Sequence, residues 1–139
     1  MNCEFELIIG KEFQIDILYK LLKDRTHNIS HSKVPDYEEH IKFVNSHPYR
    51  SWYLIKKKNN YVGTFYIKDD NSIGLNVINL DKNIVLNCIN YIKRNFAPRE
   101  SSASMVPNYF FINVAATNHE LIKIMDELII NQLQISYKI

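Results

Sequence analysis

Three short strands joined by two tight polar turns constrain the fold of this chain more than any other feature. Residues 52–77 read WYLIKKKNNYVGTFYIKDDNSIGLNV, with polar breaks at Lys58-Asn59-Asn60 and Asp69-Asp70-Asn71. Short Asn/Asp turns between alternating apolar runs predict β-hairpins. We therefore expect an antiparallel meander with strands over Ser51 to Lys57, over Tyr61 to Lys68, and from the second turn to the end of this segment.

The segments on either side of the meander show two kinds of apolar spacing. Alternation predicts strands, and recurrence every three to four residues predicts helices. In chain order these are a strand over Cys3 to Ile9, helices over Lys11 to Lys23 and Asp36 to Asn45, the meander, a helix over Ile84 to Ile92 capped by Asn79 or Asp81, a strand over Tyr109 to Ala115, a helix over Asn118 to Leu128, and a final strand over Gln132 to Ile139. The predicted order is β-α-α-β-β-β-α-β-α-β in a single domain over residues 1–139. This is an α+β or α/β fold whose mixed, mostly antiparallel central sheet has helices on both faces.

The composition excludes several classes of protein. A net charge of +2 with scattered lysines does not support a nucleic-acid partner. Cys3 and Cys88 lie far apart with no CxxC pair, and the spacing of His27, His31 and His40 fits no metal site, so we expect no disulfide framework and no metal. No run approaches the ~18 apolar residues of a membrane span, and the N-terminus does not read as a signal peptide. We expect a cytoplasmic protein without a membrane partner.

Several short motifs, taken in their order along the chain, carry a family resemblance. They are His47-Pro48-Tyr49-Arg50, Trp52-Tyr53-Leu54-Ile55, Tyr61-Val62-Gly63, Asn71-Ser72-Ile73-Gly74-Leu75, Ile112-Asn113-Val114-Ala115 leading to Asn118, and Gln134-Ile135-Ser136-Tyr137. Together they resemble the GNAT superfamily of acetyl-coenzyme A-dependent N-acetyltransferases, and in particular bacterial members thought to act on amino sugars or sugar nucleotides. The resemblance spans nearly the whole chain. It implies acetyl-CoA or CoA as the cofactor, a small-molecule amine such as an amino sugar as the acceptor, and a homodimer as a possible assembly.

The resemblance also implies where the cofactor lies. In GNAT proteins the fourth and fifth strands run parallel and then splay apart, and the pantetheine arm of the cofactor pairs with the free backbone of the fourth strand. The implied cofactor-binding residues are Leu75, Asn76 and Val77 on the fourth strand, with Asn113, Asn118 and Lys82 around them. Gly74 either permits a bulge in the fourth strand or relieves crowding beneath an aromatic ring, and we expect the bulge.

The segment after the fourth strand lacks the family's phosphate-binding loop. Residues 77–83 read VINLDKN and contain no glycine, whereas the R/Q-x-x-G-x-G/A loop of the family surrounds a pyrophosphate with backbone N–H groups at a helix N-terminus. Lys82 offers one positive charge, and Asp81 beside it repels phosphate. Two interpretations stay open: the helix N-terminus binds phosphate with the help of Lys82, or it is capped by Asn79 or Asp81 and holds no ligand.

The usual catalytic groups of the family are replaced as well. The glutamate that often precedes Ile-Gly on the fourth strand is Ser72, and the tyrosine expected seven residues beyond Asn118 is Met125. His27 and His31 lie in the loop between the first two helices, and histidine has a suitable pKa for a general base. The candidate catalytic residues are therefore His31, His27 and Ser72. The candidate substrate-binding residues are His47, Tyr49 and Tyr53.

Two classes of function follow from these observations. The first is a GNAT-like acyltransferase that transfers an acetyl group from acetyl-CoA to an amine of a small metabolite such as an amino sugar. The alternative is a catalytically degenerate GNAT-fold module that binds a ligand or a partner without acetyl transfer. The cleft strands favour the first class, and the replaced loop, base and acid favour the second.

Overall fold

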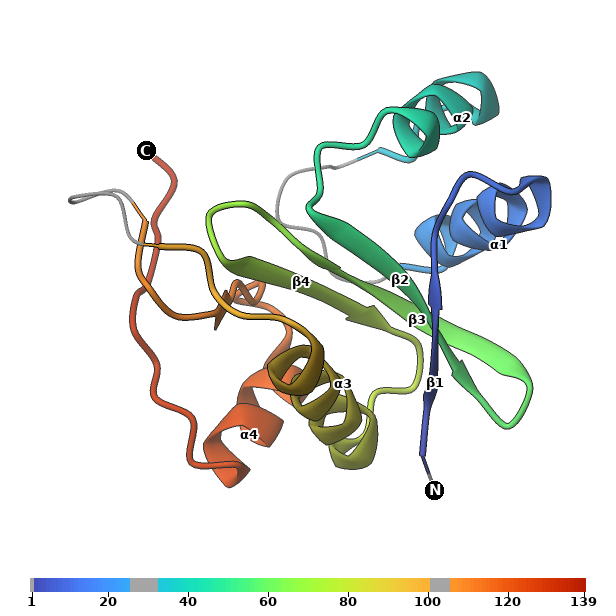
Figure 1. Ribbon diagram of the computed structural model, residues 1–139. Helices are drawn as coiled ribbons and strands as arrows, with labels where there is room; N and C mark the ends of the chain where they lie inside the picture. Colours follow the sequence, from blue (N-terminus) through green and yellow to red (C-terminus); the bar gives the residue numbers. More distant parts are fainter. Residues whose placement is uncertain (1, 26–32, 101–105) are drawn as a thin grey trace.

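A computed structural model describes residues 2–25, 33–100 and 106–139 (Figure 1). It contains four helices and five strands in these residues. In chain order they are β1 (Glu4–Leu7), α1 (Glu12–Lys23), α2 (Tyr37–Asn45), β2 (Ser51–Lys57), β3 (Asn60–Ile67), β4 (Ser72–Val77), α3 (Lys82–Asn95), β5 (Phe111–Ile112) and α4 (His119–Glu127).

The five strands form one sheet in the order β1-β2-β3-β4-β5. The first three pairings are antiparallel, and β4 pairs with β5 in parallel. The meander is confirmed, with its two turns where the Asn/Asp runs predicted them. Lys58, Asn59 and Asn71 adopt left-handed backbone conformations there, with φ of 51°, 64° and 71°. Asparagine tolerates this conformation better than most residues, which explains the turn sequences.

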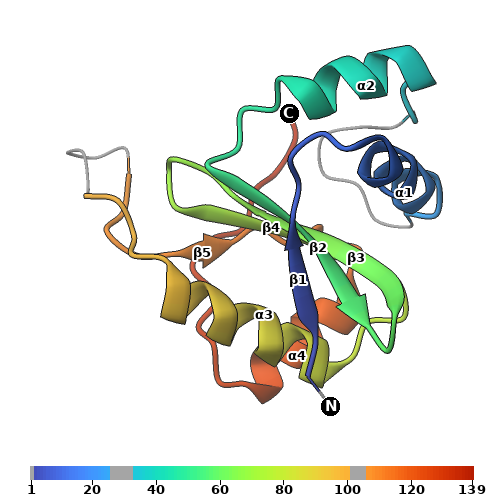
Figure 2. The ribbon, with the colours of Figure 1, turned by 45° about the vertical axis from the view of Figure 1, so that its right-hand side comes forward.

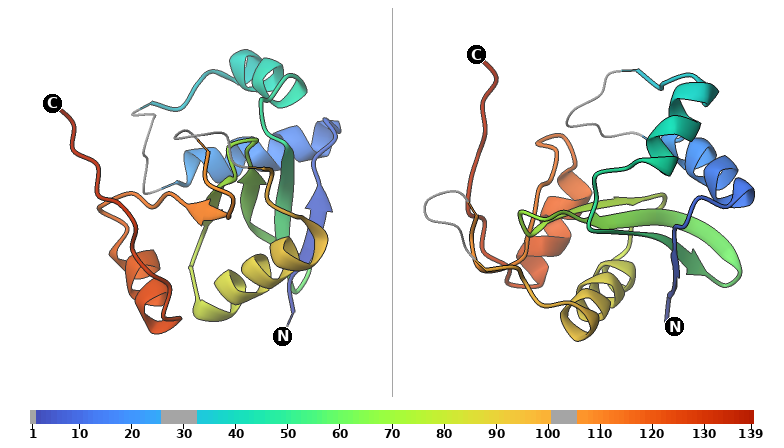
Figure 3. Two further views of the ribbon diagram at one scale, coloured as in Figure 1. Left: turned by 60° about the vertical axis from the view of Figure 1, so that its left-hand side comes forward. Right: turned by 45° about the horizontal axis from the view of Figure 1, so that its top comes forward.

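Helices cover both faces of the sheet, as predicted. Figure 3 shows α1 and α2 on one side and α3 and α4 on the other. Leu54 and Ile55, adjacent on β2, are both fully buried because successive strand residues point to opposite faces. Leu54 belongs to the apolar cluster under α1 and α2, and Ile55 to the cluster under α3. The sheet therefore has an apolar core on each of its two faces.

Side-chain caps fix where three of the helices begin. Asp36 accepts a hydrogen bond from the N–H of Glu39 at 2.8 Å and starts α2. Asp81, rather than Asn79, caps α3, and Asn118 caps α4 as predicted. Each cap satisfies a backbone donor that the first turn of a helix leaves free. No helix within the described ranges combines the length and apolar character needed to cross a bilayer.

The C-terminal part of the sheet differs from the prediction. The expected strand over Gln132 to Ile139 is wrong: this segment is extended, exposed and in no sheet (Figure 2). Its alternating residues Leu133 and Ile135 are 65% and 64% exposed. The expected strand over Tyr109 to Ala115 shortens to β5, which has a neighbour only on its β4 side. Alternation indicates that a segment suits a strand, but it does not supply the neighbouring strand that completes the hydrogen bonds.

Replacing Leu54 by alanine tests the two-sided core. We expect Leu54→Ala to lower the free energy of unfolding by about 2–5 kcal/mol, because the side chain is fully buried. Leu133→Ala is the matched control and changes stability by less than about 0.5 kcal/mol if the tail is unpacked. Urea denaturation measures both. A large loss in Leu133→Ala would contradict the exposed tail.

Candidate functional site

A cleft opens where β5 leaves β4. The two strands pair only at Ser72–Phe111 and Ile73–Ile112, whereas the pairing of β4 with β3 continues to Val77. The cleft is small, with a volume of about 40 Å³. The parallel, splayed strands are the arrangement that the GNAT resemblance implies. The lining residues are Arg25, Tyr66, Gly74, Leu75, Asn76, Asn113, Val114, Ala115, Asn118 and Leu121.

The edge of β4 offers free backbone groups to this cleft. The N–H of Ile78 donates to the carbonyl of Val62 at 2.8 Å. The even-numbered residues of β4 therefore form the backbone hydrogen bonds with β3. Hydrogen-bonding direction alternates along an antiparallel pair, and the odd-numbered residues therefore face β5. Leu75 and Val77 lie beyond Ile73, the last residue paired with β5. Among the described residues, none hydrogen-bonds to their cleft-facing N–H and C=O groups.

This alternation divides the three predicted strand residues between two roles. Leu75 lines the cleft, and Val77 continues the same edge of β4 with its backbone N–H and C=O on the β5 side. Asn76 directs its backbone toward β3 and contributes to the cleft lining by its side chain instead. Asn113 and Asn118 lie across from it, and the Asn118 carboxamide also accepts a hydrogen bond from the N–H of Leu121 at 3.2 Å.

Gly74 accommodates an aromatic ring rather than a bulge. The register between β3 and β4 runs without interruption through Gly74, which pairs with Tyr66. The expected bulge in β4 is therefore wrong. A Cβ atom at Gly74 would lie 2.1 Å from Cζ and 2.5 Å from the hydroxyl oxygen of Tyr66. The missing side chain lets Tyr66 lie flat over β4 at the point where β5 departs.

Tyr66 is held in this position from its other face. Its ring stacks on Tyr49 with centroids 3.9 Å apart and an interplanar angle of 8°. Burial raises the pKa of Tyr66, and the nearby Arg25 guanidinium opposes that rise. Burial also raises the pKa of Tyr49 to about 12. Both phenols are neutral at physiological pH, and Tyr66 belongs to the cleft lining.

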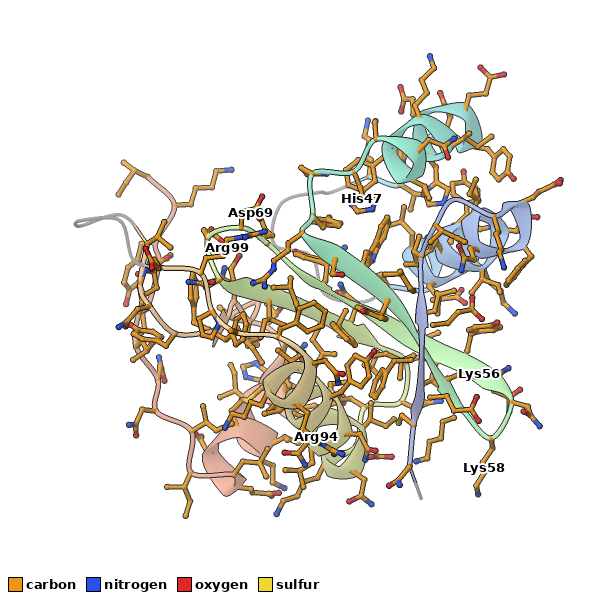
Figure 4. All side chains as sticks on the ribbon, in the orientation of Figure 1. His47, Lys56, Lys58, Asp69, Arg94 and Arg99 are labelled. Atoms are coloured by element: carbon orange, nitrogen blue, oxygen red, sulfur yellow. The ribbon has the colours of Figure 1, made fainter. Side chains whose placement is uncertain are left out.

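Asn71 fixes the start of the cleft. It is fully buried, and its carboxamide donates to the carbonyls of Arg99 and Pro107 at 3.0 and 2.7 Å. The same carboxamide accepts from the N–H of Arg99 at 2.7 Å, and the Asn71 carbonyl accepts from the N–H of Phe111 at 3.2 Å. Arg99 also pairs with Asp69 at 2.9 Å across this turn (Figure 4). The segment before β5 is thereby attached to the β3–β4 turn.

Ser72 lies buried at the start of β4 and is already hydrogen-bonded. Its hydroxyl donates to Asp70 Oδ1 at 2.5 Å, and its N–H donates to the same oxygen at 2.9 Å. Burial acts to raise the pKa of Asp70, but these hydrogen bonds outweigh it and the pKa is lowered. A catalytic role for Ser72 stays a prediction, as do those of His27 and His31, which lie outside the described residues.

The predicted substrate residues do not all face the cleft. Tyr49 contacts Tyr66, as described above. His47 lies beside a second hollow of about 220 Å³, which is also lined by residues 8–10, 44 and 45, and burial lowers its pKa. Tyr53 points to the opposite face of the sheet, where it stacks on Phe65 and contacts Tyr91. Of the three, the structure brings only Tyr49 into contact with a residue of the cleft.

The N-terminus of α3 already holds a carboxylate. Asp81 Oδ1 accepts from the N–H of Ile84 at 2.9 Å, and Oδ2 accepts from Lys57 Nζ at 2.9 Å. The Lys57 ammonium is the main reason why the pKa of Asp81 is lowered, followed by the N–H of Ile84. Lys82 is exposed. The sequence placed Lys57 at the end of a strand, and nothing in its spacing indicated this ion pair.

Two further observations concern residues away from the β4 edge. Met125 packs against the cluster that joins α3 and α4. No group of three His, Cys, Asp or Glu side chains suited to a metal is found in residues 2–25, 33–100 and 106–139.

Solved structures show the fold class of the chain. A possible acetyltransferase from Clostridium difficile 630 has a TM-score of 0.54 at 14% identity, over 100% of this chain and 99% of that chain. A dodecameric spermidine N-acetyltransferase from Vibrio cholerae has a TM-score of 0.56 at 10% identity, over 91% of this chain and 77% of that chain. No protein-family model and no curated protein matches the sequence. The chain has a GNAT-like fold, with a mostly antiparallel mixed sheet between helices.

Replacing Asn71 by aspartate tests whether the hydrogen bonds of its side chain position β5. Aspartate keeps the size and tolerates the left-handed backbone, but it removes both N–H donors to the carbonyls of Arg99 and Pro107. We expect a loss of about 2–4 kcal/mol in the free energy of unfolding and faster hydrogen exchange at the Phe111 N–H. Asn60→Asp, in the exposed β2–β3 turn, is the control. Equal effects of the two substitutions would contradict the role of Asn71.

Proposed function

We propose that this chain is an acyltransferase that takes an acyl group from a pantetheine thioester and transfers it to a small amine. The free edge of β4 is the observation that supports this most, because Leu75 lines the cleft and the N–H and C=O groups of Leu75 and Val77 on the β5 side have no partner among the described residues. A pantetheine arm carries two amide groups and can pair with such an edge as an added strand. Acetyl-CoA is the donor that the family resemblance implies. Its pantetheine portion fits the β4 edge, whereas its diphosphate does not fit the α3 N-terminus, where Asp81 lies.

Tyr66 is the residue that we assign to proton donation. Acyl transfer breaks the bond from the acyl carbon to sulfur, forms one to nitrogen, and leaves a thiolate that takes up a proton. The Tyr66 hydroxyl lies over Gly74, where β4 and β5 separate, and its proton is present at physiological pH. The amine must lose a proton, and His31 and His27 remain our candidates for the base, with Ser72 as the third candidate catalytic residue.

The lining of the cleft favours a hydroxylated amine as the acceptor. Asn76, Asn113 and Asn118 supply carboxamides, which donate to and accept from hydroxyl groups. None of the described lining residues is a carboxylate, so the cleft has no anion to attract a polycation. We therefore propose an amino sugar rather than a polyamine such as spermidine. A cytoplasmic homodimer is the form in which we expect the protein to act.

A catalytically degenerate binding module is the second candidate. Met125 fills the core where the family resemblance implies a tyrosine, and the Ser72 hydroxyl is engaged by Asp70. Such a module keeps the β4 edge and binds the thioester without consuming it. Incubating the protein with S-acetylpantetheine and glucosamine, and measuring the thiol released, distinguishes the two candidates. Binding without release would favour the module.

Removing one backbone N–H group from the free edge of β4 tests whether this edge binds the ligand. Val77→Pro deletes an N–H that faces the cleft, and proline is tolerated at a strand edge where the N–H is not paired. We expect the affinity for S-acetylpantetheine to fall about fivefold, the value of one neutral hydrogen bond. Val77→Ala keeps the N–H and is the control. Calorimetry measures both, and failure of the wild-type protein to bind S-acetylpantetheine would contradict the proposed function.

Replacing Tyr66 by phenylalanine tests proton donation. We expect Tyr66→Phe to lower kcat at least about 100-fold and to leave KM unchanged, because the ring still packs between Tyr49 and Gly74. Tyr49→Phe removes a similarly buried hydroxyl that does not line the cleft, and we expect nearly normal kcat. Thiol release measures both rates. Equal rates for the Tyr66→Phe variant and the wild type would remove Tyr66 from the mechanism.

A further inference from the structure

We infer that the cleft takes an acylated pantetheine arm that lacks the nucleotide diphosphate of coenzyme A. This inference rests on the proposed function, because it specifies the donor of the same site. It follows from the contacts of the β4–α3 segment. That segment lies where a diphosphate attached to an arm along β4 meets the start of α3.

The first observation is that a carboxylate occupies the anion position of α3. Asp81 accepts from the N–H of Ile84 at 2.9 Å, and the N–H of Asn83 also points to it. A helix N-terminus favours one anion because its partial positive charge is confined to the first turn. Here the chain supplies that anion itself. A diphosphate would have to displace Asp81 or lie beside it.

The second observation concerns the nearest ammonium group. Lys57 Nζ lies 2.9 Å from Asp81 Oδ2, so its charge is matched by that carboxylate. Lys57 is the last residue of β2, so this ion pair joins the start of α3 to the sheet. Lys82 is exposed at the first position of α3. An incoming diphosphate therefore meets an ion pair whose charges already cancel.

The third observation is that three backbone donors around the start of α3, those of Ile78, Ile84 and Val85, already have acceptors within the chain. The N–H of Ile78 donates to Val62 at 2.8 Å, and residues 78–81 contain no glycine to let phosphate oxygens approach the chain. The N–H of Val85 closes the first helical turn on the Asp81 carbonyl at 3.3 Å. A diphosphate needs several free N–H groups converging on it. These donors point instead to the chain's own acceptors.

The chemistry of the ligand is thus an extended amide chain ending in a thioester. Two sources supply such an arm: a small pantetheine thioester, and a phosphopantetheine arm attached to a carrier protein. Both lack the nucleotide, and both present the same amides to Leu75 and Val77 on β4. The binding experiment includes a probe for each.

Calorimetry on the full chain with pantetheine, CoA and ADP tests the inference. We expect pantetheine and CoA to bind within about threefold of each other and ADP not to bind. A CoA affinity more than about tenfold above that of pantetheine would overturn the inference and leave the proposed acyl transfer standing. No binding of either thiol would instead overturn the proposed function. A holo acyl carrier protein that binds more tightly than its apo form identifies the protein-borne source, and equal binding of the two identifies the small thioester.

A charge-neutral variant tests whether Asp81 is the cause. Asp81→Asn keeps a side-chain oxygen to cap α3 and removes the negative charge. We expect its CoA affinity to rise about fivefold while its pantetheine affinity stays unchanged. Asp69→Asn is the matched control, because Asp69 pairs with Arg99 at the β3–β4 turn, outside the cleft lining (Figure 4). Unchanged CoA affinity in Asp81→Asn would overturn the assignment to Asp81.

Discussion

The hydrogen bonds of Asn71 determine how the C-terminal half of the chain joins the sheet. A single buried carboxamide binds Arg99 and Pro107, and the carbonyl of the same residue binds Phe111. Phe110 and Ile112 pack against the apolar cluster under α3, and these polar bonds fix the start of β5 beside Asn71. They hold β5 parallel to β4 at one end only. The other end is free to diverge, and the cleft is the consequence.

Because β5 diverges from β4, the two edges of β4 differ beyond Ile73. Its even-numbered residues complete the ladder with β3, and Leu75 and Val77 face an opening. An unpaired strand edge invites pairing with another chain. Here the edge is short, lies inside a cleft and ends at α3, which protects it from other proteins and leaves it open to a thin ligand. Tyr66 lies across the closed end because Gly74 has no side chain.

The sequence predicted the elements that depend on local pattern. The hairpin turns, the two helical layers and the Asn118 cap came from spacing and from single residues with strong preferences. The family resemblance predicted the parallel β4–β5 pair. Contacts between distant residues were not predictable: Asn71 reads as a turn residue, and Lys57 as the last residue of a strand. The strand predicted over Gln132 to Ile139 was wrong for the same reason. Alternation specifies which face of a strand is apolar, but it does not specify the neighbouring strand.

The cleft and the start of α3 differ in the ligand charge that they favour. In the cleft, Asn76 and Asn113 offer neutral carboxamides beside the Arg25 guanidinium. At the α3 end, the helix has used its favourable anion position on Asp81, and Lys57 neutralises that carboxylate. The same contacts stabilise the start of α3 and tie it to β2. The carboxylate that caps α3 therefore also restricts which acyl donors can bind. It disfavours donors that carry a diphosphate, whatever their length.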